Sequence, residues 1–241
     1  MIYGAILASG KGTRIKDGIV LPKQFRELGD MPIIIHTLKR MLKIKKFDKI
    51  YIAVSEEYLE YMKDLIKKYI DSTLSPNIVI ICGGKERMDT IDNTINSITK
   101  DNGVGEDDVI LIHDAVRPFV TEKILNDSIE AAKKYGAAVA AEPVSDTLLI
   151  SKEGLVVDEI PQRSLYYKGQ SPDSFNLKLF IELLSKITPE NRAKITGTSQ
   201  ICTMNNYPIH MIPGDEINFK ITTASDIVMA KNIVKGEDYH D

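Results

Sequence analysis

Short apolar runs alternate with amphipathic segments along most of the chain. Runs of aliphatic and β-branched residues predict buried strands over residues 2–7, 50–54, 77–81, 109–113 and 137–142. Apolar positions at helical spacing predict helices over residues 32–42, 57–69, 88–98 and 121–134. This alternation predicts an α/β fold: a Rossmann-like, mostly parallel sheet with helices on both faces.

Local signals predict where several helices begin and end. Pro32 suits a first helical turn, Thr121 can cap the helix that follows it, and Gly136 can end that helix. Near the end of the chain, residues 209–212 predict another strand, and we expect Ser225 to cap a last helix that runs to about residue 235. Ligands of such sheets bind at the carboxyl ends of the strands, so chemistry is expected there.

Residues 145–174 interrupt the alternation. The stretch LLISKEGLVVDEI is typical of a hairpin with Glu153 and Gly154 at its turn. An excursion of this size from a sheet often reaches a neighbouring subunit. We therefore expect a single domain over residues 1–241, with 145–174 as an inserted β-arm for dimerisation, and a homodimer.

Composition limits the classes of partner. Apolar residues make up 43% and charged residues 27% of the 241 positions, and the net charge is −3, so no bulk field favours nucleic acid or a membrane surface. Cys82 and Cys202 form no disulfide framework. The sequence shows no signal-peptide pattern and no apolar run of spanning length, so we expect a cytoplasmic protein.

A glycine loop with cations follows the first predicted strand. The stretch ASGKGTRIK contains Gly10, Gly12 and Arg14, and Lys23 lies a few residues later in LPKQF. Glycines let backbone N–H groups approach an anion, and the cations add charge. The loop fits neither the Walker pattern nor the dinucleotide pattern, because Ile15 stands where each requires glycine.

Motifs spread along the whole chain carry a resemblance to a known family. They read LASGKGTR, LPKQF, GGKERMDTI, HDAVRPF, SDT, PQRSLYYKGQSPDSF and NFKITTASDI. Together they resemble the cytidylyltransferases that condense CTP with a polyol phosphate. The resemblance implies a single nucleotidyltransferase domain that uses CTP, a polyol phosphate and Mg²⁺, and releases pyrophosphate.

The resemblance also implies roles for individual residues. Arg14 and Lys23 would neutralise the triphosphate and Lys220 would contact the α-phosphate, which makes these three cations the catalytic candidates. Asp114 would hold Mg²⁺ through its carboxylate. A second carboxylate ligand stays open between Asp215 and Glu216.

Two further groups are implied around the substrates. The CTP-binding candidates are Ala8, Ser9, Gly10, Gly12, Gly83, Gly84, Lys85 and Thr90. The acceptor-binding candidates are Asp114, Arg117, Thr147 and, from the arm of a partner, Arg163. His36, His113 and His210 are interpreted as structural, and His240 lies in a tail.

The motifs indicate the acceptor less specifically than they indicate CTP. LPKQF, HDAVRPF and YYKGQSPDSFN resemble the D-ribitol 5-phosphate branch, so we expect CDP-ribitol as product. The alternatives are 2-C-methyl-D-erythritol 4-phosphate and another polyol phosphate. Gly197 departs from the family pattern, which usually has aspartate there. A nucleotide-binding regulatory protein without catalysis and a sugar nucleotidyltransferase are the competing classes.

Overall fold

The computed structural model describes residues 1–10 and 21–236 of the chain. The expectations for Gly12, Arg14 and His240 therefore lie outside the described residues. Within the described part, no helix is long and apolar enough to cross a bilayer.

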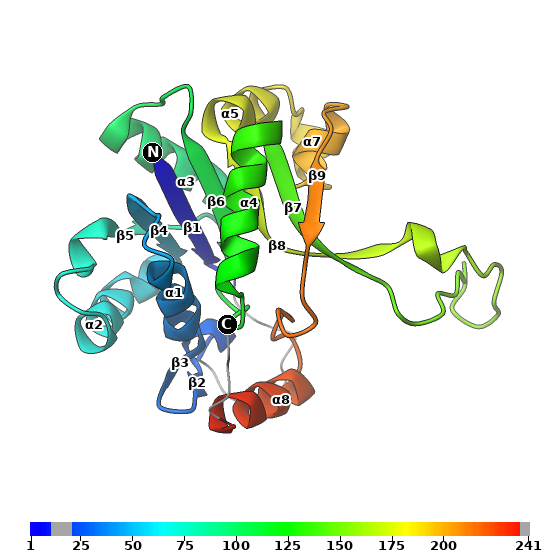
Figure 1. Ribbon diagram of the computed structural model, residues 1–241, viewed down its shortest axis with the longest axis horizontal. Helices are drawn as coiled ribbons and strands as arrows, with labels where there is room; N and C mark the ends of the chain where they lie inside the picture. The colour runs from blue at the N-terminus through cyan, green and yellow to red at the C-terminus, as the bar shows by residue number, and fades with distance from the viewer. Residues whose placement is uncertain (11–20, 237–241) are drawn as a thin grey trace.

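A twisted seven-stranded sheet, in the order β5-β4-β1-β6-β8-β7-β9, forms the centre of the described chain (Figure 1). Its strands are β1 (Ile2–Ala8), β4 (Lys49–Val54), β5 (Ile78–Cys82), β6 (Val109–Asp114), β7 (Ala137–Pro143), β8 (Tyr167–Asn176) and β9 (His210–Pro213). β1 pairs in parallel with β4 and β6, whereas β8 is antiparallel to both β6 and β7. The predicted mostly parallel sheet is confirmed.

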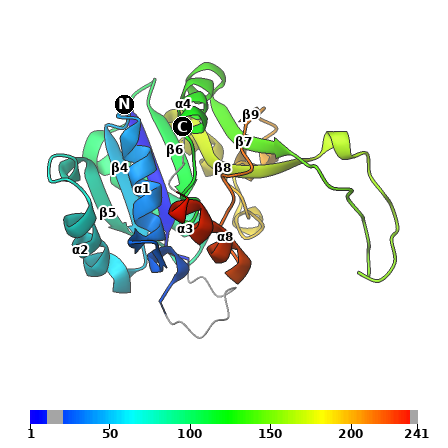
Figure 2. The same ribbon diagram turned by 60° about the horizontal axis from the view of Figure 1, so that its bottom comes forward.

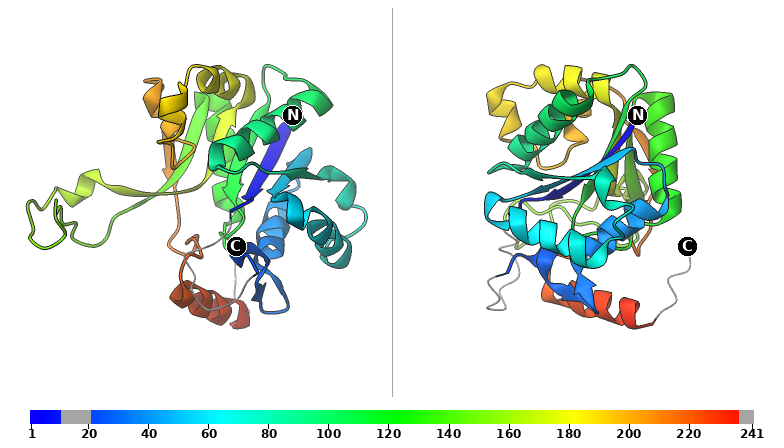
Figure 3. Two further views of the ribbon diagram at one scale, coloured as in Figure 1. Left: turned by 180° about the vertical axis from the view of Figure 1, so that it is seen from behind. Right: turned by 90° about the vertical axis from the view of Figure 1, so that its left-hand side faces the viewer.

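Helices cover both faces of the sheet, as two views of the molecule show (Figure 3). Apolar side chains of α1 (Ile33–Lys43), α2 (Leu59–Tyr69) and α4 (Glu122–Tyr135) pack on one face. Those of α3 (Arg87–Asn102), α5 (Leu177–Ser185) and α7 (Gln200–Met204) pack on the other. A further short helix, α6, spans Pro189–Arg192. The Rossmann-like layering expected from the sequence is therefore present.

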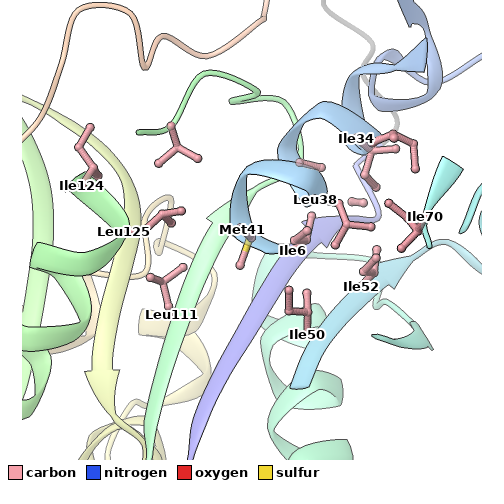
Figure 4. Close-up of a cluster of buried hydrophobic side chains, with 14 of the residues drawn as sticks. Ile6, Ile34, Leu38, Met41, Ile50, Ile52, Ile70, Leu111, Ile124 and Leu125 are labelled. Carbon is pink, nitrogen blue, oxygen red and sulfur yellow. The ribbon is translucent and has the colours of Figure 1, made fainter. Parts of the chain in front are cut away.

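The larger core lies between α1, α2, α4 and the sheet (Figure 4). Ile6, Ile50 and Leu111 from three strands face Leu38 and Met41 of α1 in this cluster, and each is at most 1% exposed. Alternate residues of β1 point to opposite faces, so Tyr3 and Ala5 belong to the other core. Because side chains on both faces of β1 are buried, the carboxyl end of this strand is held in the middle of the sheet.

A third, smaller cluster joins residues near position 30 to the C-terminal helix of the described chain. α8 (Ala224–Lys235) packs with the short hairpin of β2 (Glu27–Leu28) and β3 (Met31–Pro32), through a cluster that includes Leu28, Val116 and Ile221. This unit lies below the carboxyl ends of the strands (Figure 2). It brings the LPKQF and NFKIT segments to the same end of the sheet.

The sequence predicted some of the helix ends correctly and others wrongly. Thr121 caps α4 by accepting a hydrogen bond from the Ile124 amide, and Gly136 ends it at φ 82°, as predicted. Pro32 stands before α1 rather than in its first turn. Ser225 does not cap α8: Thr223 does, in a capping box with Asp226.

The arm is shorter than its predicted range. Residues 167–176 form β8, which lies inside the central sheet between β6 and β7, so the boundary at Ser174 was wrong. The segment that extends from the body covers residues 144–166 (Figure 1). Within it, Ile150 and Glu159 form an antiparallel bridge and Gly154 has φ 76°, consistent with the predicted hairpin turn.

Candidate active site

Asp114 is the last residue of β6, and its neighbour in the register is Leu7 of β1. Three cationic side chains of the described residues contact its carboxylate. Lys220 Nζ lies 2.9 Å from Oδ2, Arg87 Nη1 3.2 Å from Oδ1 and Arg117 Nε 3.5 Å from Oδ2. The sheet edge therefore carries an excess of positive charge around one buried carboxylate.

The cations decide the ionisation of Asp114. Burial disfavours the charged carboxylate, but Lys220, Arg87 and Arg117 together outweigh burial and hold the pKa of Asp114 well below its ordinary range. Arg117 is itself buried, and its Nη1 donates to the Asn218 carbonyl at 2.6 Å. Its Nε has no hydrogen-bond acceptor among the described residues. Such a set of donors suits an incoming phosphate.

A histidine and a serine hold the turn that follows β6. Ser171 Oγ accepts a hydrogen bond from the Asp114 amide at 3.1 Å and lies 2.9 Å from His113 Nδ1. The Arg117 carbonyl can only accept, so His113 Nε2, 3.1 Å away, carries the hydrogen and donates to it. In the neutral ring Nδ1 is then the acceptor, and it takes its hydrogen bond from the Ser171 hydroxyl. Burial lowers the pKa of His113 to about 4, which keeps the ring neutral. The predicted structural role of His113 agrees with these contacts.

The LPKQF and NFKIT segments, which lie far apart in the sequence, meet beside this turn. Lys23 is buried, and its Nζ donates to the Ile221 carbonyl at 3.1 Å. Asn218 Nδ2 donates to Gln170 Oε1 and to the Ser171 carbonyl, at 3.0 and 2.9 Å. The NFKIT segment is thereby tied both to LPKQF and to β8, which brings the catalytic candidates Lys23 and Lys220 to one region.

A second group of predicted residues meets beyond β1. Thr90 Oγ1 donates to the Glu86 carbonyl and accepts from the Gly84 amide at 3.0 Å, which leaves Ser9 Oγ, 2.8 Å away, as a donor to it. A Cβ on Gly83 would stand 2.6 Å from Ser9 Cβ, and one on Gly84 would stand 2.1 Å from Asp89 Cβ. Glycine at both positions is required by close packing against the β1 loop and α3.

A glutamine contacts the end of β1 and the residue Gly10 beyond it. Gln24 Nε2 donates to the carbonyls of Ala8 and Gly10, at 2.6 and 3.0 Å, and Ser55 Oγ donates to the Ser9 carbonyl. Ala8 and Gln24 are buried, whereas Gly10 is exposed. Lys85 is exposed as well.

A cavity of about 800 Å³ opens beside Lys220 and Arg117. Gln170 and Phe219 line it, as do the carboxylate residues Asp215 and Glu216. Its position between β8, the NFKIT segment and α8 places it next to the Asp114 cluster. A small phosphorylated molecule would fit in this volume.

Two acceptor candidates lie elsewhere in this chain. Thr147 is exposed on the arm, and Arg163 is exposed with Nη1 donating to the Ser145 carbonyl at 2.5 Å. The contacts of the described residues do not bring either one to Asp114 of the same chain. Arg163 was expected to act from a partner, and this expectation stays a prediction. Thr147 was expected to act beside Arg117 of its own subunit, and the contacts of the described residues do not show this.

The described residues contain no group of three histidine, cysteine, aspartate or glutamate side chains that could hold a metal ion on their own. Asp114 offers one carboxylate at the edge of the cationic cluster. Mg²⁺ commonly takes one or two carboxylates, with substrate phosphates and water as its other ligands. The donor set fits an ion that arrives with a nucleotide and does not fit a resident metal centre.

Sequence reasoning missed several site residues. Arg87, Gln24, Ser171 and Asp173 all stand in motifs quoted for the resemblance, yet none was singled out. Arg87 carries a charge within GGKER, which is a usable signal. Asp173 also carries a charge within a quoted motif, but Gln24 and Ser171 do not, and only their burial distinguishes these two.

Comparisons with a family model and with solved structures place the chain among known proteins. The family model described as IspD, 2-C-methyl-D-erythritol 4-phosphate cytidylyltransferase, matches residues 2–236. A solved 4-diphosphocytidyl-2C-methyl-D-erythritol synthase from Anaerococcus prevotii is 27% identical, with a TM-score of 0.80 and 98% of each chain covered.

Two other solved structures are similar. The 2-C-methyl-D-erythritol 4-phosphate cytidylyltransferase from Francisella tularensis is 26% identical at a TM-score of 0.75, covering 95% of this chain and 97% of that one. The enzyme of that name from Thermus thermophilus is 21% identical at a TM-score of 0.71, covering 96% and 98%, which supports the fold. With a family model that spans nearly the whole chain, we conclude that the chain belongs to the IspD family of cytidylyltransferases.

Proposed function

We propose that this enzyme transfers the cytidylyl group of CTP to 2-C-methyl-D-erythritol 4-phosphate. The description of the matching family model and the names of the two similar structures above 25% identity support this acceptor. They favour it over D-ribitol 5-phosphate, which the sequence motifs had favoured. The ribitol ester remains the second candidate because of the stretch YYKGQSPDSFN.

The single observation that carries the proposal is the cationic cluster at Asp114. Lys220, Arg87 and Arg117 offer charged donors beside a cavity that suits a phosphorylated polyol. In the proposed reaction, an oxygen of the acceptor phosphate attacks the α-phosphorus of CTP. A new P–O bond forms, the bond between the α-phosphorus and the bridging oxygen breaks, and pyrophosphate leaves with that electron pair.

The protein's part in this reaction is positioning and charge stabilisation. Arg117 would orient the acceptor phosphate, Lys220 would contact the α-phosphate of CTP, and Lys23 would neutralise charge on the triphosphate. Ser9, Thr90 and the Gly83–Gly84 pair would shape the pocket for the cytidine. Arg14 and Gly12 are proposed for the triphosphate on the sequence motif alone.

Mg²⁺ is proposed to bind with the triphosphate, and the Asp114 carboxylate would be its protein ligand. The ion would supply charge neutralisation at the phosphates. Asp114 is already ionised at neutral pH because its pKa is held low, so no proton has to leave before an ion binds.

A homodimer is proposed through the arm of residues 144–166. The arm exposes apolar side chains, with Leu155 88%, Val156 73% and Leu165 71% accessible. Apolar side chains gathered on one projecting segment are expected to be buried against another chain. The same contact would carry Arg163 towards the site of the neighbouring subunit.

The test is an acceptor screen with CTP. Purified protein, CTP and Mg²⁺ are mixed with each polyol phosphate in turn, and pyrophosphate release is measured. The methylerythritol ester is expected to give the highest kcat/KM. Faster turnover with the ribitol ester would reverse the assignment, and CTP binding in calorimetry without turnover on either acceptor would indicate a regulatory protein.

A further inference from the structure

Glu142 is a carboxylate at the edge of the sheet that the reaction proposed above does not use. It stands near the end of β7, after residues 137–141, which are apolar and buried. Since β8 is antiparallel to both β6 and β7, these two strands run in the same direction and their carboxyl ends lie at one edge of the sheet. Glu142 therefore shares the ligand-binding edge with Asp114, the last residue of β6.

Glu142 also lines the cavity of about 800 Å³ that Arg117 and Lys220 line. Its side chain is 12% exposed. The walls of one cavity thus combine two cations with a carboxylate. A molecule with a phosphate and several hydroxyl groups matches such walls, because the cations attract the phosphate, whereas the carboxylate repels the phosphate and accepts hydrogen bonds from hydroxyls.

The described residues use only part of the hydrogen-bonding capacity of Glu142. Gln170 Nε2 donates to Oε2 at 3.1 Å, and Lys168 Nζ lies 3.4 Å from Oε1. Lys168 stands opposite Glu142 in the register of β7 and β8, and Gln170 follows two positions later on the same face of β8. Each carboxylate oxygen can accept two hydrogen bonds, so one position on each oxygen is left for a ligand.

Gln170 holds the carboxylate in one orientation. Its Nε2 also donates to the Asp215 carbonyl at 2.8 Å, and its Oε1 accepts from the Asp215 amide and from Asn218 Nδ2, at 3.3 and 3.0 Å. A carbonyl can only accept and an amide N–H can only donate, so the Gln170 amide cannot be reversed. Because Gln170 is also buried, its contact with Glu142 is preorganised.

Hydrogen bonds connect Glu142 to the proposed phosphate-binding residue. Asn218, which donates to Gln170, uses its backbone carbonyl to accept from Arg117 Nη1 at 2.6 Å. An unbroken path therefore runs from Glu142 through Gln170 and Asn218 to Arg117. The carboxylate and the guanidinium are held by one network, as recognition of two parts of a single molecule requires.

We propose that Glu142 determines the specificity for the acceptor by accepting hydrogen bonds from the hydroxyl groups of the polyol, while Arg117 binds its phosphate. This inference rests on the proposed function, to which it adds the residue that recognises the polyol. A phosphate ester without hydroxyl groups would leave the Glu142 carboxylate without donors in a closed site. The site therefore favours polyhydroxylated esters.

The test is calorimetry in the presence of Mg²⁺ and the α,β-methylene analogue of CTP, whose α–β bridge cannot be broken. This analogue fills the nucleotide site, so each titrant reports on the acceptor site. The titrants are 2-C-methyl-D-erythritol 4-phosphate, D-ribitol 5-phosphate and inorganic phosphate, which lacks the polyol. Glu142→Leu is expected to weaken binding of the better ester about tenfold or more, the scale of losing hydrogen bonds to a charged group. Inorganic phosphate should bind no more than about twofold more weakly.

Two further variants complete the comparison. Glu142→Gln keeps the size of the side chain and an acceptor oxygen for Gln170 but loses the charge, so it should weaken the ester about threefold or more. Glu130→Leu is the matched control, because Glu130 is an exposed glutamate of α4 that pairs with Lys133. It should change the affinity for either class of titrant less than about twofold.

The proposal is overturned if Glu142→Leu weakens the ester and inorganic phosphate equally, as a general disturbance of the site would, or weakens neither. It is also overturned if the parent binds both esters no more tightly than inorganic phosphate. Should the melting temperature show that Glu142→Leu does not fold, Glu142→Gln decides by the same comparison. If the parent released no pyrophosphate with any acceptor, the proposed function would fail, while these titrations would still decide whether Glu142 binds the polyol.

Discussion

Lys220 Nζ lies 2.9 Å from Asp114 Oδ2, although 106 positions separate the two residues in the chain. The contact closes one side of the cationic cluster at the end of β6. Because Lys220 is about one third exposed, its ammonium group can leave Asp114 for a substrate phosphate without a large rearrangement. This ion pair joins the HDAVRPF and NFKIT motifs at the proposed reaction centre.

Lys220→Ala is expected to lower kcat at least ~100-fold, the scale of losing one charge contact made in the transition state. Steady-state pyrophosphate release measures the effect. Lys63→Ala is a suitable control, since Lys63 is exposed on α2 and pairs with Glu60. A loss below about tenfold in Lys220→Ala would remove Lys220 from the catalytic set.

Lys23→Ala is also expected to lower turnover by at least ~100-fold. Its buried ammonium both serves the triphosphate in the proposal and ties LPKQF to the Ile221 carbonyl, so Lys23→Arg is the companion variant that retains the charge. The same loss is expected for Arg14→Ala on the sequence motif alone. Normal turnover in either alanine variant would contradict the assigned role.

Gly84→Ala is expected to destabilise the nucleotide end of the site. An added Cβ would stand 2.1 Å from Asp89 Cβ and 2.7 Å from its backbone carbon, so α3 or its preceding loop has to shift. Overpacking of this kind costs about 1–3 kcal/mol in the free energy of unfolding.

Urea denaturation measures this cost, and KM for CTP should rise along with it. Gly197→Ala is the matched control, because a Cβ there meets only Ser199 Oγ, at 3.8 Å. Its unfolding free energy should stay within about 0.5 kcal/mol of the parent. Equal stability of the two variants would show that the packing at Gly84 is looser than these distances indicate.

The buried side chains of His113 and Asp173 are expected to change the free energy of unfolding in opposite directions as the pH falls. Burial lowers the pKa of His113 from 6.5 to about 4, so below pH 6.5 the unfolded chain takes up a proton that the folded chain does not, and stability falls. Burial raises the pKa of Asp173 from 3.8 to about 7, so below pH 7 the folded chain takes up the extra proton and stability rises. Between about pH 6.5 and 4 the two contributions largely cancel.

In Asp173→Asn, the pH dependence of the unfolding free energy that comes from His113 should therefore become measurable. Relative to the parent, its unfolding free energy is expected to fall with decreasing pH, by up to about 1.4 kcal/mol per pH unit. His113→Gln should show the opposite slope relative to the parent. Urea titrations at pH 7, 6 and 5 measure both, and parallel curves for all three proteins would rule out the shifted pKa values.

Leu155→Asp combined with Val156→Asp is expected to give a monomer. These side chains are the most exposed apolar residues at the arm tip, and charges there would oppose burial against another chain. Sedimentation equilibrium compares the variant with the parent and with Lys152→Ala, a polar change on the same arm. A parent that is already monomeric, or a double variant that still dimerises, would refute the role of the arm.

The amino-acid sequence alone predicted much of the architecture. The strand and helix ranges follow from apolar periodicity, because a two-residue or 3.6-residue repeat is a local property of the chain. β8 was missed because its YKGQSPDSFN stretch lacks that pattern: Gln170, Ser171 and Asp173 are polar and yet buried in the sheet. Contacts of Ser171 with His113 and of Gln170 with Asn218, which come from distant positions, offset the cost of this burial.

Sequence motifs by themselves indicated the cytidylyltransferase family, and they predicted that the chemistry lies at the strand ends and involves the cations Lys23, Arg117 and Lys220. Only the tertiary structure decided that Arg87 and Lys220 converge on Asp114, that Gln24 and Ser171 hold the neighbouring loops, and that Asp173 is buried in β8. The physical reason is that charge and glycine spacing are properties of a short stretch of sequence. The hydrogen-bond partners of buried polar groups instead depend on which distant segments the packed sheet brings together.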